Sequence, residues 1–273
     1  MLSEPILLGI AAVFGAMLGS FLNVCVYRLP RNESVVRPRS RCPSCGTVVA
    51  WHDNVPVFSW LVLRGRCRQC SARISAQYPL VEAAVALIWA GSLYALGPVA
   101  DALAAALFLT LLLGILLTDA QHFIIPDEFS LGGLGAGLAL AFFTDLGIVQ
   151  ALIGAATGFA LLWVVKAAGD FALGRGWIGG GEVQETLGAD EPPSTMGGGD
   201  IKVLAMIGAF VGWQGVLATV FLGALLGTLA FLPSLFRGRK PLVPFGIFLA
   251  LGAAVWLVAG ARLAAWYAAF VRP

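Results

Sequence analysis

The chain has 273 residues, of which 59% are hydrophobic and 12% are charged, whereas soluble domains average roughly 45–50% apolar and about 25% charged residues. Its mean hydropathy is +0.88 and long uncharged runs recur along it, which excludes an ordinary soluble enzyme. A formal net charge of +2 does not favour nucleic acid as a partner, so membrane lipid and membrane-borne substrates are the expected partners. The composition predicts an all-α polytopic membrane protein.

Seven uncharged runs mark the predicted membrane helices. They are 5–27, 83–100, 102–118, 129–144, 146–165, 203–236 and 241–261. A span needs about 17–25 residues at about 1.5 Å per residue, but the run 203–236 has 34 residues and contains Gly212-Trp213-Gln214-Gly215. We expect an interfacial turn there, because glycine loosens a helix and Trp prefers the headgroup level. The predicted count is therefore about eight transmembrane helices.

The basic residues set the expected orientation. Nine of the 17 Lys and Arg lie between Arg28 and Arg73, and loops rich in Lys and Arg stay in the cytoplasm. We therefore expect a retained first helix (1–27), a small cytoplasmic domain inserted after it (28–77) and a transmembrane domain (78–273). Within the last, the stretch at about 170–200 is rich in Gly, Pro and acidic residues and is predicted to be a mobile cytoplasmic loop.

Four cysteines in the inserted domain form two CxxC pairs separated by 21 residues. The pairs are Cys42-Pro-Ser-Cys45 and Cys67-Arg-Gln-Cys70. Two such knuckles supply the four thiolates of a closed, structural zinc site. Disulfides or redox-active pairs are the alternative, which a cytoplasmic location disfavours. His52 could replace one thiolate, although a solvated or packing role is more common, and Cys25 in the first run is expected to be an inert apolar residue.

Three carboxylates adjoin apolar runs on the predicted cytoplasmic side, namely Asp119, Asp127 and Asp200. Ionisable groups at such positions are costly and point to function. Two carboxyls brought within about 3–5 Å cannot both ionise, so one keeps a proton while the other activates water. This is the chemistry of aspartic proteases.

Each carboxylate also has a structural alternative. Asp127 follows Pro126 at a predicted helix start and resembles a capping residue. Asp200 could cap the helix that follows, but capping does not require the three glycines before it, which permit close backbone approach. Asp119 ends a span, where the helix dipole disfavours a negative charge. Lys202 is expected to anchor its helix at the interface, and His122 is left without a role.

Several motifs, in this order and spacing, resemble the type IV prepilin peptidase family over almost the whole chain. They are Gly19-Ser20-Phe21-Leu22-Asn23-Val24, Tyr27-Arg28-Leu29-Pro30, the two CxxC pairs, Ser59-Trp60-Leu61, Arg64-Gly65-Arg66-Cys67, Tyr78-Pro79-Leu80-Val81-Glu82, Thr118-Asp119, Ile125-Pro126-Asp127, Gly197-Gly198-Gly199-Asp200-Ile201-Lys202 and Pro244-Phe245-Gly246.

The resemblance implies a bifunctional enzyme of the bacterial inner membrane and a GxGD-type intramembrane aspartyl protease. Its catalytic carboxylates correspond to Asp119 and Asp200 here. Such an enzyme removes a short basic leader from type IV prepilins or pseudopilins at the cytoplasmic face, in pilus and type II secretion systems. It then methylates the new N-terminal residue from S-adenosylmethionine.

Two features stay open in this comparison. No glycine-rich nucleotide loop stands out near the cysteines, so the residues that bind S-adenosylmethionine are unassigned. The stretch from Gly174 to Met196 is longer than in many family members.

Two other classes remain as alternatives: a proton- or ion-coupled transporter with a regulatory zinc domain, and a binding scaffold, which would tolerate Asn in place of Asp119 and Asp200.

Overall fold

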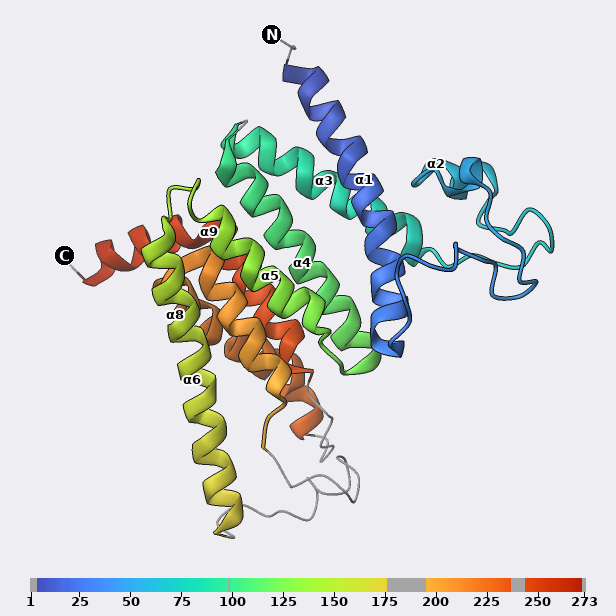
Figure 1. Cartoon of the computed structure of the whole chain (residues 1–273). Helices are drawn as coiled ribbons and strands as arrows, with labels where there is room; N and C mark the ends of the chain where they lie inside the picture. Colours follow the sequence, from blue (N-terminus) through green and yellow to red (C-terminus); the bar gives the residue numbers. More distant parts are fainter. Residues whose placement is uncertain (1–3, 98, 176–194, 237–243, 272–273) are drawn as a thin grey trace. The chain divides into compact units, whose positions relative to one another are not determined.

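The computed structural model describes residues 4–97, 99–175, 195–236 and 244–271. These residues form helices joined by loops (Figure 1), with two isolated β-bridges, so the all-α class is confirmed for them. The chain divides into two compact units, Met1–His122 and Phe123–Pro273. Each unit is described by itself.

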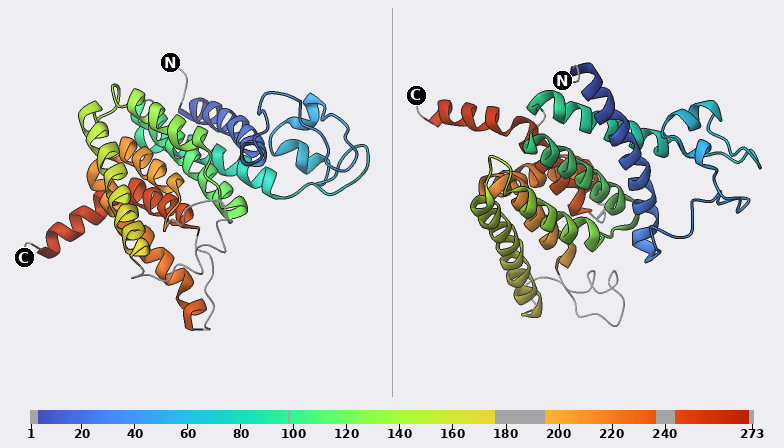
Figure 2. Two further views of the ribbon diagram at one scale, coloured as in Figure 1. Left: turned by 60° about the horizontal axis from the view of Figure 1, so that its bottom comes forward. Right: turned by 45° about the horizontal axis from the view of Figure 1, so that its top comes forward.

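The first unit consists of three long helices and a segment inserted between the first two. Its elements are α1 (Glu4–Arg28), the 3-10 helices η1 (Leu29–Arg31) and η2 (Trp51–Asn54), α2 (Phe58–Val62), α3 (Gln77–Leu96) and α4 (Ala100–His122). Figures 1 and 2 show α3 crossing α1, with the inserted segment extending from the ends of these two helices. The insertion expected after the first helix is therefore present in the structure.

Two glycines allow α1 and α3 to cross in close contact. A Cβ on Gly19 would lie 2.7 Å from Glu82 Cα, and one on Gly15 would lie 2.7 Å from the Val85 carbonyl oxygen. Small residues four apart let two backbones approach, and van der Waals contact then holds the helices together. Val85 is fully buried at this crossing.

The second unit contains α5 (Asp127–Leu140), α6 (Ile148–Gly174), α8 (Gly198–Phe236) and α9 (Phe245–Val271). Gly158 of α6 faces the Leu204 carbonyl of α8, and Gly154 faces that of Gly208, so closely that neither position has room for a Cβ. The core of this unit is the buried row on α8 formed by Val203, Leu204, Met206 and Ile207. Glycine contacts of the same kind thus hold α6 against α8.

The predicted interruption of the 34-residue run is confirmed. Gly212 has φ 69° and ψ 179°, which is not helical, and it divides α8 into two helical stretches. This positive φ costs glycine little, whereas a residue with a Cβ would be strained.

The count of eight spans is not confirmed. Five described helices are long and apolar enough to cross a membrane, namely α1, α3, α4, α6 and α8, and a shorter apolar stretch covers Phe245–Gly260. Helix α5 has only 14 residues, which reach about 21 Å at 1.5 Å per residue, less than about 30 Å of hydrocarbon. The run 129–144 predicted a longer helix, but α5 ends at Leu140 and a turn follows.

The acidic, glycine-rich loop is shorter than predicted, because the helices on both sides of it extend further. Helix α6 continues through Asp170 to Gly174, and α8 begins at Gly198. The predicted mobility concerns mainly residues 176–194, which lie outside the described residues.

Candidate functional site

The two CxxC pairs fold as two equivalent knuckles. In the first, the N–H of Cys42 donates to the Thr47 carbonyl and that of Gly46 donates to Cys42, both at 2.9 Å. In the second, the N–H of Cys67 donates to Ala72 and that of Ser71 donates to Cys67, again both at 2.9 Å. An antiparallel bridge closes each knuckle, Arg41 with Val48 and Arg66 with Arg73.

Each knuckle turns sharply at one residue with positive φ. Gly46 has φ 70° and Ser71, at the corresponding position, has φ 57°. Glycine adopts this conformation freely, whereas Ser71 adopts it at some cost in backbone strain. The turn directs both sulfurs of a pair to the same side.

The four Sγ atoms converge on one point. They all lie within 4.8 Å of one another, and Cys42 Sγ is 3.7 Å from Cys70 Sγ. Four sulfurs bound to zinc at about 2.3 Å in a tetrahedron would be about 3.8 Å apart. The chemistry and spacing of these residues therefore fit a four-thiolate metal site, and His52 is not part of the cluster.

Hydrogen bonds favour thiolate at two of the cysteines. The hydroxyl and then the N–H of Thr47 lower the pKa of Cys45 to about 6. The N–H groups of Cys70 and Gln69 lower the pKa of Cys67. At Cys70 the N–H of Ala72 lowers the pKa, but burial and the neighbouring sulfurs outweigh it and raise the pKa to about 11. A bound cation would relieve this mutual repulsion.

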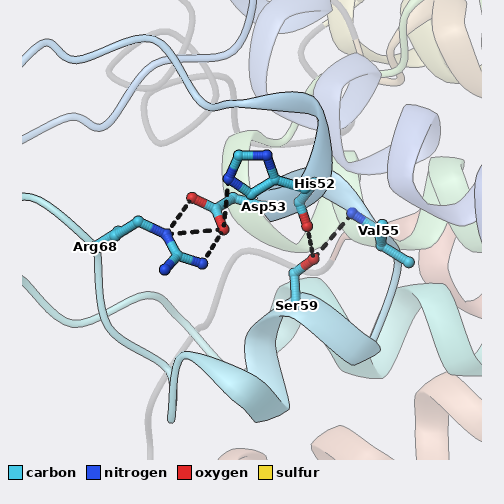
Figure 3. A network of polar contacts seen from close by, with 5 residues as sticks. All are labelled: His52, Asp53, Val55, Ser59 and Arg68. Atoms are coloured by element: carbon cyan, nitrogen blue, oxygen red, sulfur yellow. Dashed lines mark hydrogen bonds and ion pairs between the residues drawn. The ribbon is translucent and has the colours of Figure 1, made fainter.

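An ion pair joins the second knuckle to the segment before α2, as Figure 3 shows. Arg68 donates from Nε to Asp53 Oδ2 at 2.9 Å and from Nη2 to Asp53 Oδ1 at 2.6 Å. This guanidinium holds the pKa of Asp53 below its usual value of 3.8. His52 Nε2 is 3.8 Å from the same carboxylate, so His52 belongs to this polar network and not to the cysteine cluster.

Asp119 lies in the last turn of α4 and is only 5% exposed. The preceding residue, Thr118, is fully buried and donates its hydroxyl to the carbonyls of Gly114 and Ile115 at 3.0 and 3.1 Å. Asp119 is thus a buried carboxylate at the negative end of its helix dipole, which disfavours a negative charge there.

Asp200 lies in the first turn of α8 and is half-buried. Among the glycines before it, Gly199 has the tightest surroundings, because a Cβ there would lie 3.3 Å from Ile125 Cβ. A Cβ on Gly198 would meet nothing within 4 Å. The sequence predicted that the backbone at all three glycines approaches a neighbour closely. The structure shows such an approach at Gly199, toward Ile125.

Asp127 and Lys202 form an ion pair that the sequence did not predict. Lys202 Nζ is 2.6 Å from Asp127 Oδ1, and Asp127 makes no capping hydrogen bond at the start of α5, where Pro126 is the N-cap residue. Asp127 thus pairs with Lys202 and does not cap α5 through its side chain, while the interfacial anchor role of Lys202 stays a prediction. The ion pair joins the first turns of α5 and α8, next to Asp200.

A second polar contact, which the sequence did not predict, holds the chain just before the glycines. Asp170 Oδ1 accepts hydrogen bonds from the N–H and hydroxyl of Thr195 at 2.8 and 2.9 Å. Lys166 Nζ donates to Asp170 Oδ2 at 3.0 Å and to the Met196 carbonyl at 3.2 Å. The Lys166–Asp170 spacing of i and i+4 on a helix was the available signal.

The structure thus brings Asp200 together with Asp127, Lys202 and Ile125 in the second unit, while Asp119 belongs to the first unit. The cysteine cluster also belongs to the first unit. The meeting of Asp119 with Asp200 remains a prediction.

Comparison with known proteins covers both units. The model of the bacterial peptidase A24 N-terminal domain matches residues 13–96, and that of the type IV leader peptidase family matches residues 106–232. No solved structure matches the chain significantly.

Relatives named prepilin leader peptidase/N-methyltransferase align with most of the chain. The protein from Burkholderia pseudomallei strain 1026b is 36% identical over 93% of this chain and 85% of its own length. That from Aeromonas hydrophila is 34% identical over 93% of this chain and 91% of its own length. That from Myxococcus xanthus is 38% identical over 79% of this chain, but the match spans 59% of its own length. The two family models together cover both CxxC knuckles, Asp119 and Asp200. Together with these relatives, they show that the chain belongs to the type IV leader peptidase family.

Proposed function

We propose that this chain is an intramembrane aspartyl endopeptidase that removes the leader from prepilins or pseudopilins and then N-methylates the new N-terminal residue. The observation that carries the proposal is the similarity over 93% of the chain to prepilin leader peptidase/N-methyltransferases. The order follows from chemistry, because the amine that accepts the methyl group exists only after the peptide bond is cut.

Asp119 and Asp200 are the proposed catalytic pair. Both lie at helix ends beside apolar helices, and Asp119 is buried. In the reaction, one carboxylate takes a proton from water while the protonated partner donates to the scissile carbonyl. The tetrahedral intermediate then releases the amine, which receives a proton. Acid–base steps of this kind contribute on the order of 10²–10⁴-fold each.

The experiment is to incubate purified protein with a prepilin-like peptide and S-adenosylmethionine and to follow the peptide by mass spectrometry. Loss of the leader mass reports cleavage, and a methyl gain on the product reports transfer. Asp119→Asn and Asp200→Asn should each abolish cleavage, because an amide cannot exchange the proton that the mechanism requires. Retained turnover in either variant would remove that residue from the pair.

Asp127→Asn is the matched control for this experiment. Asp127 is a carboxylate at the start of a helix in the same unit as Asp200, but its partner is Lys202. The variant should weaken the junction of α5 with α8 and still cleave. A complete loss of cleavage in the folded Asp127→Asn variant would assign the catalytic role differently.

Zinc is the metal proposed for Cys42, Cys45, Cys67 and Cys70, whose role would be to hold the inserted domain together. The site offers no open coordination position for chemistry. S-adenosylmethionine would supply the methyl group. The described part of the inserted segment contains no strand followed by a glycine-rich loop and helix, so we assign no residues to this cofactor and derive no step through it.

The proposed placement is a multi-pass protein of the bacterial inner membrane, with the cysteine domain and the carboxylates on the cytoplasmic side. The concentration of arginine after the first helix supports this sidedness. We also propose that the chain divides into a first helix (1–27), the inserted cysteine domain (28–77) and a transmembrane domain (78–273). The match to the peptidase family disfavours a transporter. If the protein in proteoliposomes processes peptide and accumulates no solute, a transporter is excluded.

A further inference from the structure

Helix α2, in the segment inserted between α1 and α3, presents an unusually apolar face. Phe58, Leu61 and Val62 lie at positions i, i+3 and i+4, and they are 64%, 59% and 58% exposed. Ser59 and Trp60 occupy the opposite side and are held by hydrogen bonds to the chain. Water-soluble surfaces seldom expose adjoining large apolar side chains in this way, so the face is expected to have a partner.

The position of α2 along α1 identifies the environment of this face. The N–H of Val57, next to α2, donates to Glu82 Oε2 at 2.7 Å, and Glu82 Cα adjoins Gly19 of α1. Gly19 precedes Arg28, where α1 ends, by nine residues, or about 14 Å of helix. In Figures 1 and 2, α2 likewise lies level with the middle part of α1, although the two helices are set apart.

At the same level, the exposed surface of α1 and α3 is apolar. Met17 and Phe21 of α1 flank Gly19 and are exposed, as is Leu80 of α3. Both helices are apolar enough to cross a membrane, so their exposed side chains face lipid. The face of α2 therefore lies at the same level along α1 and α3 as lipid-facing side chains.

Glu82 is suited to hold such an element in an apolar environment. Its side chain is nearly buried at 7% exposure and accepts the Val57 N–H. Val57 has φ 60° and ψ −51°, and the N–H of Phe58 donates to the Pro56 carbonyl at 2.6 Å across this tight turn. Unsatisfied backbone groups are costly in lipid, so the carboxylate satisfies a donor that the turn leaves outside the helix.

Exposed arginines follow α2 directly. Arg64, Arg66, Arg68 and Arg73 are all exposed, and residues 28–77 carry nine Arg against Glu33 and Asp53. Long basic side chains beside an apolar face extend toward anionic headgroups. The apolar face and the basic residues together match the boundary between hydrocarbon and anionic headgroups.

We infer that α2 is a re-entrant element whose Phe58, Leu61 and Val62 face lies in the hydrocarbon boundary of the bilayer, held there by the hydrogen bond from Val57 to Glu82. The occupant of this face is the lipid of an anionic membrane. The inserted segment is thus a membrane-seated domain and not one suspended in water between two helices.

The test places a fluorine probe at two sites of the full-length protein. Phe58, and in a second sample Gln69, is replaced by 4-trifluoromethylphenylalanine in vesicles of phosphatidylethanolamine and phosphatidylglycerol. Gln69 is exposed at the tip of the second knuckle. Fluorine relaxation is then measured with dissolved oxygen, which enters hydrocarbon, and with a charged nickel chelate, which stays in water.

At position 58 the ratio of the oxygen effect to the nickel effect should exceed that at position 69 on the order of tenfold, because charged solutes are excluded from hydrocarbon. Nickel reaching position 58 as readily as position 69 would overturn the inference. Shielding of position 58 from both reagents would also overturn it, since protein and not lipid would then cover the face.

Two variants test the hydrogen bond that positions α2. Glu82→Gln keeps a carbonyl acceptor for the Val57 N–H and should preserve the relaxation ratio at position 58. Glu82→Ala removes the acceptor and should lower that ratio toward the value at position 69. An unchanged ratio in folded Glu82→Ala would show that Glu82 does not hold α2 in place.

Discussion

A single guanidinium joins two parts of the inserted segment that are distant in sequence. Arg68, between the second pair of cysteines, binds the carboxylate of Asp53 through two nitrogens. A bidentate pair of this kind fixes geometry as well as charge. Because Asp53 precedes α2, the pair also determines how the knuckles are placed next to that helix.

Removing this ion pair should lower the Tm by an amount that does not depend on pH near neutrality. Arg68→Gln should lower the Tm slightly, measured by tryptophan fluorescence in detergent. Since Arg68 depresses the pKa of Asp53 below 3.8, its stabilisation is complete above that value and is lost only as the pH falls through the lowered pKa. The Tm difference from the unsubstituted protein should therefore stay constant from about pH 8 to about pH 5.

Arg66→Gln is the control for Arg68→Gln. Arg66 lies beside the same knuckle, and its side chain makes no ion pair within the described residues. It should leave the Tm almost unchanged. A Tm difference for Arg68→Gln that shrinks between about pH 8 and about pH 5 would contradict the lowered pKa of Asp53.

At the scale of elements, glycine positions decide which helices can pack. Gly19 meets the backbone of α3 at Glu82, whereas a Cβ on Gly9, in the same helix, would meet nothing within 4 Å. Gly19→Val should destabilise the first unit by about 1–3 kcal/mol through overpacking. Gly9→Val should leave stability nearly unchanged, and thermal unfolding in detergent compares the two variants. Equal effects would mean that α1 and α3 do not cross at Gly19.

Periodicity and composition were sufficient to predict some helix boundaries but not others. The break in the run 203–236 was predicted because Gly and Trp mark an interface, and Gly212 is not helical. The end of α6 was placed too early, because Asp170 was read as the start of a polar loop. Its carboxylate is instead satisfied by Thr195 and Lys166, so the helix continues to Gly174. Thr195 is 25 positions away and leaves no local signal, whereas the i, i+4 spacing of Lys166 and Asp170 was the one signal available.

At the scale of the whole molecule, the division into two units predicts separable responses to loss of metal. Chelation, or Cys42→Ser, should remove bound zinc and make residues 28–77 sensitive to trypsin, because a segment of about 50 residues buries too little apolar surface to be stable alone. Helices α6 and α8 should keep their thermal stability, since their packing does not involve the cysteines. Zinc content and limited proteolysis measure the two effects.

Cys25→Ser is the control for metal loss. Cys25 is buried in α1, apart from the cluster of four sulfurs. This variant should retain the metal of the unsubstituted protein. If Cys42→Ser contains as much zinc as Cys25→Ser does, the metal assignment is wrong.

The sequence by itself determined the helical class, the cluster of four cysteines, the candidate carboxylates and the family, because hydrophobic runs, CxxC spacing and ordered motifs are local signals. Only the tertiary structure decided the partners of polar side chains: Lys202 with Asp127, Asp170 with Thr195 and Glu82 with Val57. These pairs join residues that are 25 or more positions apart. Their geometry depends on how helices pack, which glycine contacts fix in three dimensions and no local pattern encodes.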